Sequence, residues 1–402
     1  MNLNNTIKLT KAANITTGRL DSNASEKNGI YPFFTCAPEP QRINSYEFDC
    51  NAILLAGNNA AGNFHISKYY GKFNAYQRTY IITNKENYDL DYLYYSLKIS
   101  LATFKRISQG SQTKFLTMDI LDSFKVLDIG IPKQKKIVCI LKMLDSKILL
   151  NNKINAELEQ MARNLFNYWF VQFDFPNKED KPYKTSGGEM EYSALLKRDI
   201  PVNWKVGKLG EFISIKRGIS YKSKEIGDEG LPMINLNSFN LDGAYKWDGL
   251  KYYSGKVNNE KIINAGDLLI ATTDVTRRAK IIGKAFIIPD IFNESIVMSC
   301  DIAKVEIDKN LDKFYLELLF NSDYFHKYIK GFASGTMVLH LDVAGIEMYK
   351  CVIPPEWLLK KYASVKEDIE RKKSLILKEN EELSKVRDFL LPLFMNGQVK
   401  IS

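Results

Sequence analysis

The sequence predicts a mixed α/β (α+β) fold with a pseudo-twofold internal repeat, in which two similar globular domains are separated by an antiparallel coiled coil of two long helices. Three observations support this prediction. The second half of the 402-residue chain repeats the first, short apolar runs and helical segments occur in both halves, and each half ends in a long segment with heptad spacing.

The repeat extends along both halves, at a separation that grows from 200 residues near the start to 225 in the heptad segments. The matched residues are Lys8, Leu9, Ile15, Gly18 and Pro32 with Lys208, Leu209, Ile215, Gly218 and Pro232; Leu54, Leu55 and Ala56 with Leu269, Ile270 and Ala271; Asp91, Tyr94 and Leu97 with Asp312, Tyr315 and Leu318; Thr113, Leu116, Asp119 and Pro132 with Thr336, Leu339, Asp342 and Pro355; and Asn155, Glu157, Leu158 and Leu165 with Asn380, Glu382, Leu383 and Leu390. Because loops absorb insertions that packed elements resist, one scaffold with two different sets of surface loops is expected. Such a pair of platforms indicates recognition of two unlike targets.

Each half begins as a mixed α/β globule. Apolar runs bounded by Gly, Asn, Asp or Pro predict strands at 52–57, 79–83, 267–272 and 285–289. Apolar residues at helical spacing, each segment following an Asn or Asp that can cap it, predict helical structure over 91–107 and 312–329.

After Pro132 and Pro355 the pattern predicts two long helices, each with a single apolar stripe. Asn151 and Asn155 interrupt the stripe of the first helix, and Asn380 interrupts that of the second. The stripe residues are Leu144, Ile148, Leu158 and Leu165 in the first helix and Ile369, Ile376, Leu383 and Leu390 in the second. About 38 helical residues make a rod of about 57 Å, too long for a small globule to cover, so the two helices are expected to pack on each other. A lone heptad segment would more often be a dimerisation or scaffold element, but its duplication favours a spacer between two globules. Our hypothesis is that Asn155 and Asn380 fix the register in which the two helices pack on each other.

These patterns divide the chain into six parts. They are a first globular domain (1–132), a central long helix (133–172), a polar linker (173–200), a second globular domain (201–355), a C-terminal long helix (356–395) and a tail (396–402).

The charge balance favours a polyanionic partner. The chain has 56 Lys+Arg against 47 Asp+Glu, a net charge of +9, and neutralising phosphates releases condensed counterions. A solvated basic surface would give the same count. No run approaches the roughly 18 apolar residues of a membrane span and the start lacks a secretory signal, so we expect a cytoplasmic protein that does not bind membranes.

Signatures of catalysis and of metal sites are absent from the sequence. There is no phosphate-binding G-x-x-x-x-G-K-[ST] loop and no dinucleotide-binding G-x-G-x-x-G pattern. The three histidines, His65, His326 and His340, lack metal-ligand spacing, and the five cysteines include no C-x-x-C pair. We therefore expect no catalytic residues, no metal site and no cofactor in this chain.

With its order of motifs, the chain resembles the specificity subunit of type I restriction-modification systems. The resemblance covers essentially the whole chain, and its most telling stretches are Ile200–Gly218, Tyr168–Lys184, the Gly-Ser/Thr loops at Gly110 and Gly335, and the paired heptad helices. One departure is that Trp204 matches Asn4, so the first domain lacks this aromatic anchor.

The resemblance implies that each globule is a target recognition domain reading one half of a bipartite, asymmetric site on double-stranded DNA. It implies that the helices set the half-site spacing and dock methyltransferase subunits. Those partners would use S-adenosylmethionine, and restriction/translocase subunits would use ATP and Mg, so that the complex protects against phage by restriction and DNA methylation while this chain does no chemistry.

Major-groove readout uses Arg or Lys on guanine and Asn or Gln on adenine, so the DNA-binding candidates are polar residues in loops between matched elements. In the first domain they are Gln41, Arg42, Asn58, Asn59, Asn63, Gln77, Arg78, Gln109, Ser111, Gln112 and Lys114, and in the second Asn235, Asn237, Thr272, Thr273, Arg277, Arg278, Lys280, Ser334 and Thr336. Each of them could instead be a solvated loop residue or a turn former.

Two other functions remain open at this point. A non-catalytic scaffold whose two domains bind proteins would show no DNA affinity and weak salt dependence. A divergent nuclease would show metal-dependent cleavage by the isolated chain, although the missing motifs weigh against it.

Overall fold

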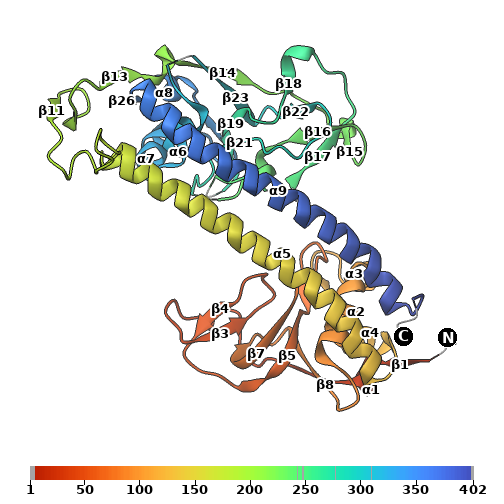
Figure 1. Cartoon of the computed structure of the whole chain (residues 1–402). Helices are drawn as coiled ribbons and strands as arrows, with labels where there is room; N and C mark the ends of the chain where they lie inside the picture. The colour runs from red at the N-terminus through yellow and green to blue at the C-terminus, as the bar shows by residue number, and fades with distance from the viewer. Residues whose placement is uncertain (1–4, 242, 247–248, 277, 309, 400–402) are drawn as a thin grey trace. The chain divides into compact units, whose positions relative to one another are not determined.

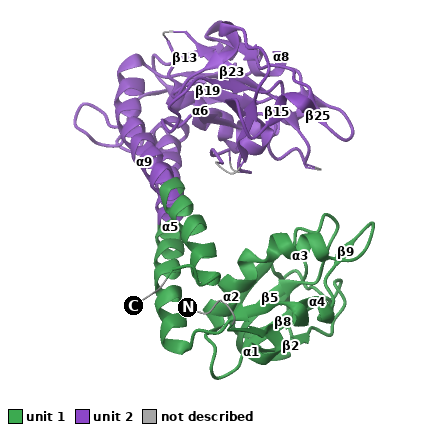
Figure 2. Cartoon of the chain, turned by 90° about the vertical axis from the view of Figure 1, so that its right-hand side faces the viewer, with its two compact units in different colours: residues 1–150, 381–402 green, residues 151–380 purple. Residues whose placement is uncertain are grey.

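The computed structural model describes residues 5–241, 243–246, 249–276, 278–308 and 310–399, which form two compact units. Unit 1 comprises residues 1–150 and 381–402, and unit 2 comprises residues 151–380 (Figure 2). The long helices α5 (Ile131–Phe166) and α9 (Glu356–Met395) each contribute residues to both units (Figure 1). None of the helices in the described part of the chain combines the length and apolar composition that a membrane crossing requires.

Unit 1 is built on a six-stranded sheet of order β2-β8-β5-β7-β3-β4. The strands are β2 (Ala13–Thr17), β3 (Tyr31–Phe34), β4 (Gln41–Ile43), β5 (Phe48–Ala56), β7 (Ile66–Ala75) and β8 (Thr79–Asn84). In the central strand β5, Ile53 and Leu55 face one hydrophobic core and Ala52 and Leu54 the other, the period-2 alternation of a sheet covered on both faces. The first of these cores also contains residues of helices α2 (Leu90–Ile99) and α3 (Leu101–Ile107).

Unit 2 repeats this topology. Its four-stranded sheet has the order β14-β23-β19-β21. These strands are, in that order, the counterparts of β2, β8, β5 and β7 in unit 1. These strands are β14 (Ile213–Arg217), β19 (Leu268–Ala271), β21 (Ala285–Ile287) and β23 (Ile302–Ile307). The parallel pairing of β3 with β7 recurs as that of β16 (Leu231–Ile234) with β22 (Ile296–Met298). The predicted fold class and its internal repeat are confirmed.

Shorter elements complete the two units. In unit 1 they are β1 (Thr6–Lys8), α1 (Leu9–Ala12), β6 (Asn58–Asn59), β9 (Lys114–Phe115), α4 (Met118–Ser123) and β10 (Lys125–Leu127). In unit 2 they include β11 (Met190–Ser193), β12 (Arg198–Pro201), β13 (Lys205–Lys208), β15 (Ile226–Gly227), β17 (Lys251–Tyr253), β18 (Ile262–Ile263), β20 (Thr273–Asp274), α6 (Lys313–Asn321), α7 (Asp323–Ile329), β24 (Ala333–Ser334), β25 (Leu339–Leu341), α8 (Ala344–Glu347) and β26 (Lys350–Ile353). The helical segments predicted at 91–107 and 312–329 are each two helices, divided at Ser100 and Ser322.

The structure corrects the repeat alignment in these helices. The N-cap of α2 is Asp89, whose carboxylate accepts from the backbone N–H groups of Asp91 and Tyr92, and the N-cap of α6 is Asp312. The counterpart of Asp312 is therefore Asp89, at a separation of 223, and not Asp91. Apolar spacing alone did not fix this offset, because Asp89 and Asp91 are two residues apart and either could cap a helix.

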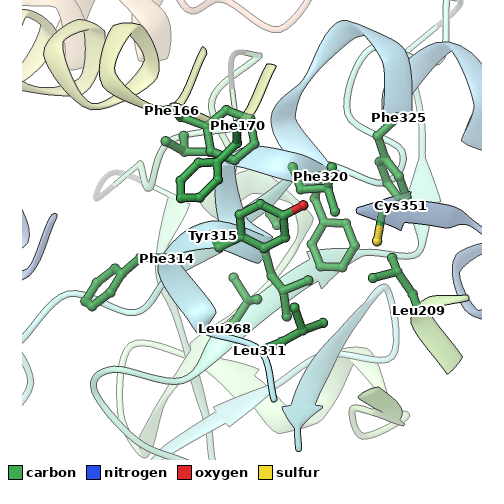
Figure 3. Close-up of a cluster of buried hydrophobic side chains, with 14 of the residues drawn as sticks. Phe166, Phe170, Leu209, Leu268, Leu311, Phe314, Tyr315, Phe320, Phe325 and Cys351 are labelled. Atoms are coloured by element: carbon green, nitrogen blue, oxygen red, sulfur yellow. The ribbon is translucent and has the colours of Figure 1, made fainter. Parts of the chain in front are cut away.

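The corrected alignment pairs Tyr92 with Tyr315, two buried tyrosines with the same hydrogen bond. The Tyr92 hydroxyl donates to the carbonyl oxygen of Leu127 and the Tyr315 hydroxyl to that of Val352, each at 2.9 Å. The first bond ties α2 to β10, and the second ties α6 to β26, the strands that precede the two long helices. In unit 2 the Tyr315 ring also packs among Phe166, Phe170 and Phe320 (Figure 3), with its centroid 5.0 Å from that of Phe170.

The heptad seam lies between α5 and α9 within each unit. In unit 1, Ile137, Val138 and Leu141 share a core with Leu391 and Phe394. In unit 2, Ala162 and Phe166 share a core with Tyr362 and Ile369. The other predicted stripe residues are half-buried: Leu144, Ile148, Leu158, Leu165, Ile376, Leu383 and Leu390.

The two seam asparagines have different surroundings. Asn380 accepts from Asn151 Nδ2 at 2.9 Å and donates to Asn152 Oδ1 at 2.9 Å. Asn151 Nδ2 also lies 2.7 Å from Glu379 Oε2. Asn155 Oδ1 is buried and has no hydrogen-bond partner among the described residues. Of the two, Asn380 therefore has the contacts that a register-fixing residue needs, and its partner is Asn151.

An ionic cluster is buried beside the seam of unit 2. Lys366 Nζ lies 2.6 Å from Glu370, 3.0 Å from Glu317 and 3.8 Å from Glu159, with 1% of its side chain exposed. Lys373 completes the cluster at 2.7 Å from Glu159. Burial raises the pKa of Glu317 to about 7. Burial acts the same way on Glu159, but Lys366 and Lys373 outweigh it and lower its pKa to about 2.

The predicted linker at 173–200 is folded into unit 2. Phe173 and Phe175 are buried in its main core, and the Phe175 ring stacks on Trp204 with centroids 5.2 Å apart. Asp174 accepts from the backbone N–H of Thr185 at 2.8 Å. Many polar residues of this segment lie in turns, and Pro176 and Pro182 face each other in an isolated β-bridge. The composition therefore did not reveal the aromatic side chains that anchor the segment.

The repeated tyrosine bond predicts matched losses of stability. Tyr92→Phe and Tyr315→Phe should each lower the free energy of unfolding of their own unit by about 1–2 kcal/mol, since a buried carbonyl loses its donor. Tyr324→Phe, at a tyrosine that is 73% exposed, is the control and should change it by less than about 0.5 kcal/mol. Urea unfolding measures all three. If Tyr92→Phe and Tyr315→Phe were as stable as the parent protein, the two bonds would not be structural.

The buried cluster predicts a pH dependence. Between about pH 4.5 and 7 the folded state binds the Glu317 proton more tightly than the unfolded chain does, so rising pH lowers the free energy of unfolding through this group. Glu317→Gln removes this loss, and its stability relative to the parent protein should increase by roughly 2–3 kcal/mol across that range. Unfolding at several pH values tests this against Glu157→Gln, whose carboxylate is 65% exposed. A constant difference would contradict it.

Candidate nucleic-acid interface

Both units place two loop segments together where the central strand of the sheet ends. In unit 1, β6 follows β5 and pairs with β9, so that Asn58 lies opposite Phe115 and Asn59 opposite Lys114. In unit 2, β20 follows β19 and pairs with β25, so that Thr273 lies opposite His340. We call residues 57–64 and 105–116 loop pair 1, and residues 272–282 and 333–341 loop pair 2.

Each loop pair contains a tight hairpin that requires glycine. Gly110 has a φ of +94° and Gly335 a φ of +125°. A Cβ on Gly110 would lie 2.1 Å from the carbonyl oxygen of Thr113, and one on Gly335 would lie 2.1 Å from that of Val338. Only glycine tolerates both the backbone conformation and this approach.

The hairpins correct the repeat alignment here to a separation of 225. The backbone N–H of Leu116 donates to Gly57 and that of Leu341 donates to Thr272, both at 2.8 Å, so Leu341 and not Leu339 is the counterpart of Leu116. The equivalent positions are therefore Gln109 and Ser334, Ser111 and Thr336, Gln112 and Met337, and Lys114 and Leu339. The predicted match of Thr113 with Thr336 rested on residue type alone. In the structure Thr336 occupies the position of Ser111, so the two threonines are not equivalent.

In each unit, one residue at an equivalent position accepts hydrogen bonds from the backbone of the loop through a side-chain carbonyl or carboxylate oxygen. Asn59 Oδ1 accepts from the backbone N–H groups of Ala61 and Asn63 at 2.9 and 3.0 Å. Its counterpart Asp274 is fully buried and accepts from three backbone N–H groups, those of Thr276, Ile281 and Ile282. Both loops are thus held in one conformation by a residue beneath them, which leaves Asn59 without the free oxygen that bidentate contact with adenine requires.

Loop pair 1 has a basic surface. Lys105 Nζ donates to Asn63 Oδ1 at 2.8 Å, and Gly62 lies between the Lys105 and Lys114 stems, where a Cβ would be 3.1 and 3.3 Å from their Cγ atoms. No Asp or Glu occurs in residues 57–64 or 105–116. The predicted residues Gln109, Ser111 and Gln112 are exposed at the hairpin. Lys105 was not predicted, because it lies on a helix and only the fold brings it to Asn63.

Loop pair 2 differs in chemistry. Arg278, Lys280, Ser334 and Thr336 are exposed on it, whereas Thr272 and Thr273 are each only 4% exposed. Thr273 Oγ1 donates to Asp301 Oδ1 at 3.2 Å. As the structure places them, Thr272 and Thr273 support the loop from below and do not present their side chains to a ligand. Arg277 lies outside the described residues.

The remaining predicted residues lie outside the two loop pairs. Gln41 and Arg42 are exposed on the edge strand β4, and Gln77 donates to Asp21 Oδ1 at 2.8 Å. Arg78 is exposed, and its carbonyl oxygen accepts from the backbone N–H of Gly57 at 2.8 Å, at the start of loop pair 1. In unit 2, Asn237 is exposed. Asn235 is 4% exposed, and its amide donates to the Gly249 carbonyl at 2.8 Å, so it is a structural residue here.

Within the described residues, no group of three or more His, Cys, Asp or Glu side chains is arranged to hold a metal ion. His326 Nδ1 lies 3.2 Å from the carbonyl oxygen of Ile282, and burial lowers the pKa of its imidazole. His65 and His340 lie on other elements, in units 1 and 2 respectively. What both units have in common is a pair of ordered polar loops with exposed cations.

Comparison with known proteins identifies the repeated unit. The family model described as the type I restriction modification DNA specificity domain matches residues 3–160 and again residues 201–384. The chain is 37% identical over 161 residues to the type I restriction enzyme EcoDI specificity subunit of Escherichia coli, a match that covers 40% of this chain and 34% of that protein. It is 23% identical over 391 residues to the MjaVIII specificity subunit of Methanocaldococcus jannaschii, covering 94% of this chain and 88% of the relative.

A solved structure shares the fold. The crystal structure of the type I restriction-modification system S subunit from M. genitalium aligns with a TM-score of 0.56 at 15% sequence identity. The alignment covers 99% of this chain and 96% of the other.

The support beneath loop pair 2 can be tested directly. Asp274→Asn replaces one acceptor oxygen by a donor, leaves buried N–H groups without a partner, and should lower the free energy of unfolding of unit 2 by about 1–3 kcal/mol. It should also accelerate amide hydrogen exchange in residues 275–282. Asp290→Asn, whose side chain is 81% exposed, is the matched control. Unchanged exchange in the Asp274 variant would show that the loop is ordered by other contacts.

Proposed function

The chain belongs to the family of type I restriction-modification DNA specificity subunits, which are non-catalytic, and on this basis we propose that each unit reads one half of a bipartite, asymmetric DNA site. The observation that carries this proposal is the repeated scaffold with unlike loop pairs. Units 1 and 2 share strand order, hairpin glycines and an organising residue, yet their exposed side chains differ. One scaffold with two surfaces suits two different half-sites.

The loop pairs suit DNA because they combine exposed cations with side chains of fixed position. Lysine and arginine at the rim would neutralise phosphates and supply affinity that falls with salt. Polar groups such as those of Gln109 and Gln112 in unit 1 can reach base edges in the major groove, where each base pair presents a distinct pattern of donors and acceptors. Phosphate contacts would position each unit, and base contacts would select the sequence.

The proposed role of α5 and α9 is to set the half-site spacing and to dock partner subunits. At 1.5 Å per residue, the 36 residues of α5 extend about 54 Å. Large apolar side chains remain exposed on both helices, among them Leu149 (71%), Met161 (60%) and Phe389 (68%). Exposed apolar surface of this kind marks interaction sites.

The partners that fit this role are methyltransferase subunits and restriction/translocase subunits. S-adenosylmethionine would be bound by the former and ATP with Mg by the latter. In the alternative function, that of a protein-binding scaffold, the apolar helix faces would be the main binding surface and the loop pairs would not contact DNA.

Selection of bound sequences from random duplex DNA tests the proposal. The chain is co-expressed with its neighbouring methyltransferase subunit, and selection is carried out at two salt concentrations. We expect two short, unlike half-sites at one spacing, with affinity that falls as salt rises. Sequence-independent binding, or none, would favour the scaffold function, and metal-dependent cleavage by the chain alone would indicate a nuclease.

The same selection tests the register hypothesis. Asn151→Leu combined with Asn380→Leu replaces the polar pair in the seam by apolar residues, which should preserve folding but allow more than one helix register. The selected sites should then show a broader distribution of half-site spacings than those of the parent protein, while the half-site sequences stay the same. A single unchanged spacing would remove the asparagine pair from this role.

A further inference from the structure

We propose that Met337, at the tip of the hairpin formed by β24 and β25, reads the 5-methyl group of a thymine in the half-site contacted by unit 2. The inference rests on the proposed function and names a specificity-determining residue within it. Met337 was not among the residues predicted from the sequence, because only polar loop residues were taken as candidates.

Met337 is the most prominent member of an exposed apolar patch. Its side chain is 88% exposed, and Val275 (62%) and Val338 (39%) are exposed as well. Val275 directly follows Asp274, and Met337 and Val338 directly precede Leu339. Because Asp274 lies opposite Leu339 in the ladder of β20 and β25, the three residues lie at the same end of this ladder.

Two features hold this patch in place. The hairpin turns at Gly335, whose conformation and close approach to Val338 admit no other residue without strain. The facing loop is fixed by Asp274, which accepts from the backbone N–H groups of Thr276, Ile281 and Ile282. A preorganised apolar patch at an exposed tip indicates a binding surface.

The surroundings of the patch fit DNA. Residues 275–282 and 333–341 contain no Asp or Glu, and the exposed Arg278 and Lys280 lie in the same loop as Val275. An apolar centre beside basic residues matches a thymine methyl group flanked by phosphates. In the major groove thymine presents a methyl group beside its O4 acceptor, and none of the other three bases presents such an apolar group there.

The repeat adds an independent argument. The position equivalent to Met337 in unit 1 is Gln112, which is exposed at the tip of the corresponding hairpin between Gly110 and Lys114. Glutamine can both donate and accept a hydrogen bond at a base edge, whereas methionine has no donor and only a weak acceptor, its thioether sulfur. The two hairpins therefore present opposite chemistries from the same place on the scaffold, as recognition of unlike bases requires.

The test uses the complex of this chain with its methyltransferase subunit and the DNA site that it selects. Each thymine of the site is replaced in turn by deoxyuridine, which removes only the 5-methyl group, and binding is measured. We expect one thymine at which the replacement weakens binding about fourfold, the effect of one buried methyl group. In Met337→Ala this sensitivity should vanish, and in Met337→Leu it should persist.

Met348→Ala is the matched control, since it truncates another exposed methionine of unit 2 (54%) that lies outside loop pair 2, and it should leave the deoxyuridine effect intact. The inference is overturned if no thymine responds, or if Met337→Ala remains sensitive. It is also overturned if Met337→Ala binds DNA normally but no longer assembles with the methyltransferase subunit, which would make the patch a protein contact. In these cases the parent complex would still select two half-sites, whereas failure of the proposed function would abolish sequence selection itself.

Discussion

The seam between α5 and α9 is the interaction on which both units depend. Neither core is complete without it, because Leu391 and Phe394 of α9 pack in unit 1 and Phe166 of α5 packs in unit 2. A long helix with one apolar stripe is stable in water only when that stripe is covered. The helices thus serve at once as packing elements of the units and as a continuous connection between them, so a change in the seam affects recognition and stability together.

The equivalent positions of the two seams are not chemically equivalent. Leu141 lies in the apolar core of unit 1, and at its counterpart Lys366 unit 2 buries an ammonium group among three glutamates. A buried ion pair costs desolvation that its mutual attraction only partly returns, so an apolar residue would be expected to give at least equal stability. The charged cluster is better explained as a device for specificity, since Lys366 of α9 can satisfy Glu159 of α5 and Glu317 of α6 only when all three helices are in one register.

The large features of the fold could be predicted from the sequence, because they depend on period and length. Heptad spacing predicted the helices, and short apolar runs predicted the strands that became β5, β8, β19 and β21. Offsets of two residues could not be resolved in the same way: Asp89 and Asp91 both have capping side chains, and Thr113 and Thr336 match in type but not in place. The candidate site was predicted in outline only. Asn59, Asn235 and Thr273 bond to backbone groups that lie far away along the chain or around a turn, and the sequence alone does not show these partners.

The organising residues beneath the loops have a consequence for how such a protein can change over generations. Asn59 and Asp274 accept from the backbone of the loops above them, and the hairpin glycines lie against carbonyl oxygens of their own turns. The tip residues Gln112 and Met337 make no hydrogen bond within the described part of the chain, so their side chains do not hold the loops in shape. Successive substitutions at the tips can give a lineage new sequence preferences while the inherited framework stays intact, so that recognition diversifies without a new fold for each target.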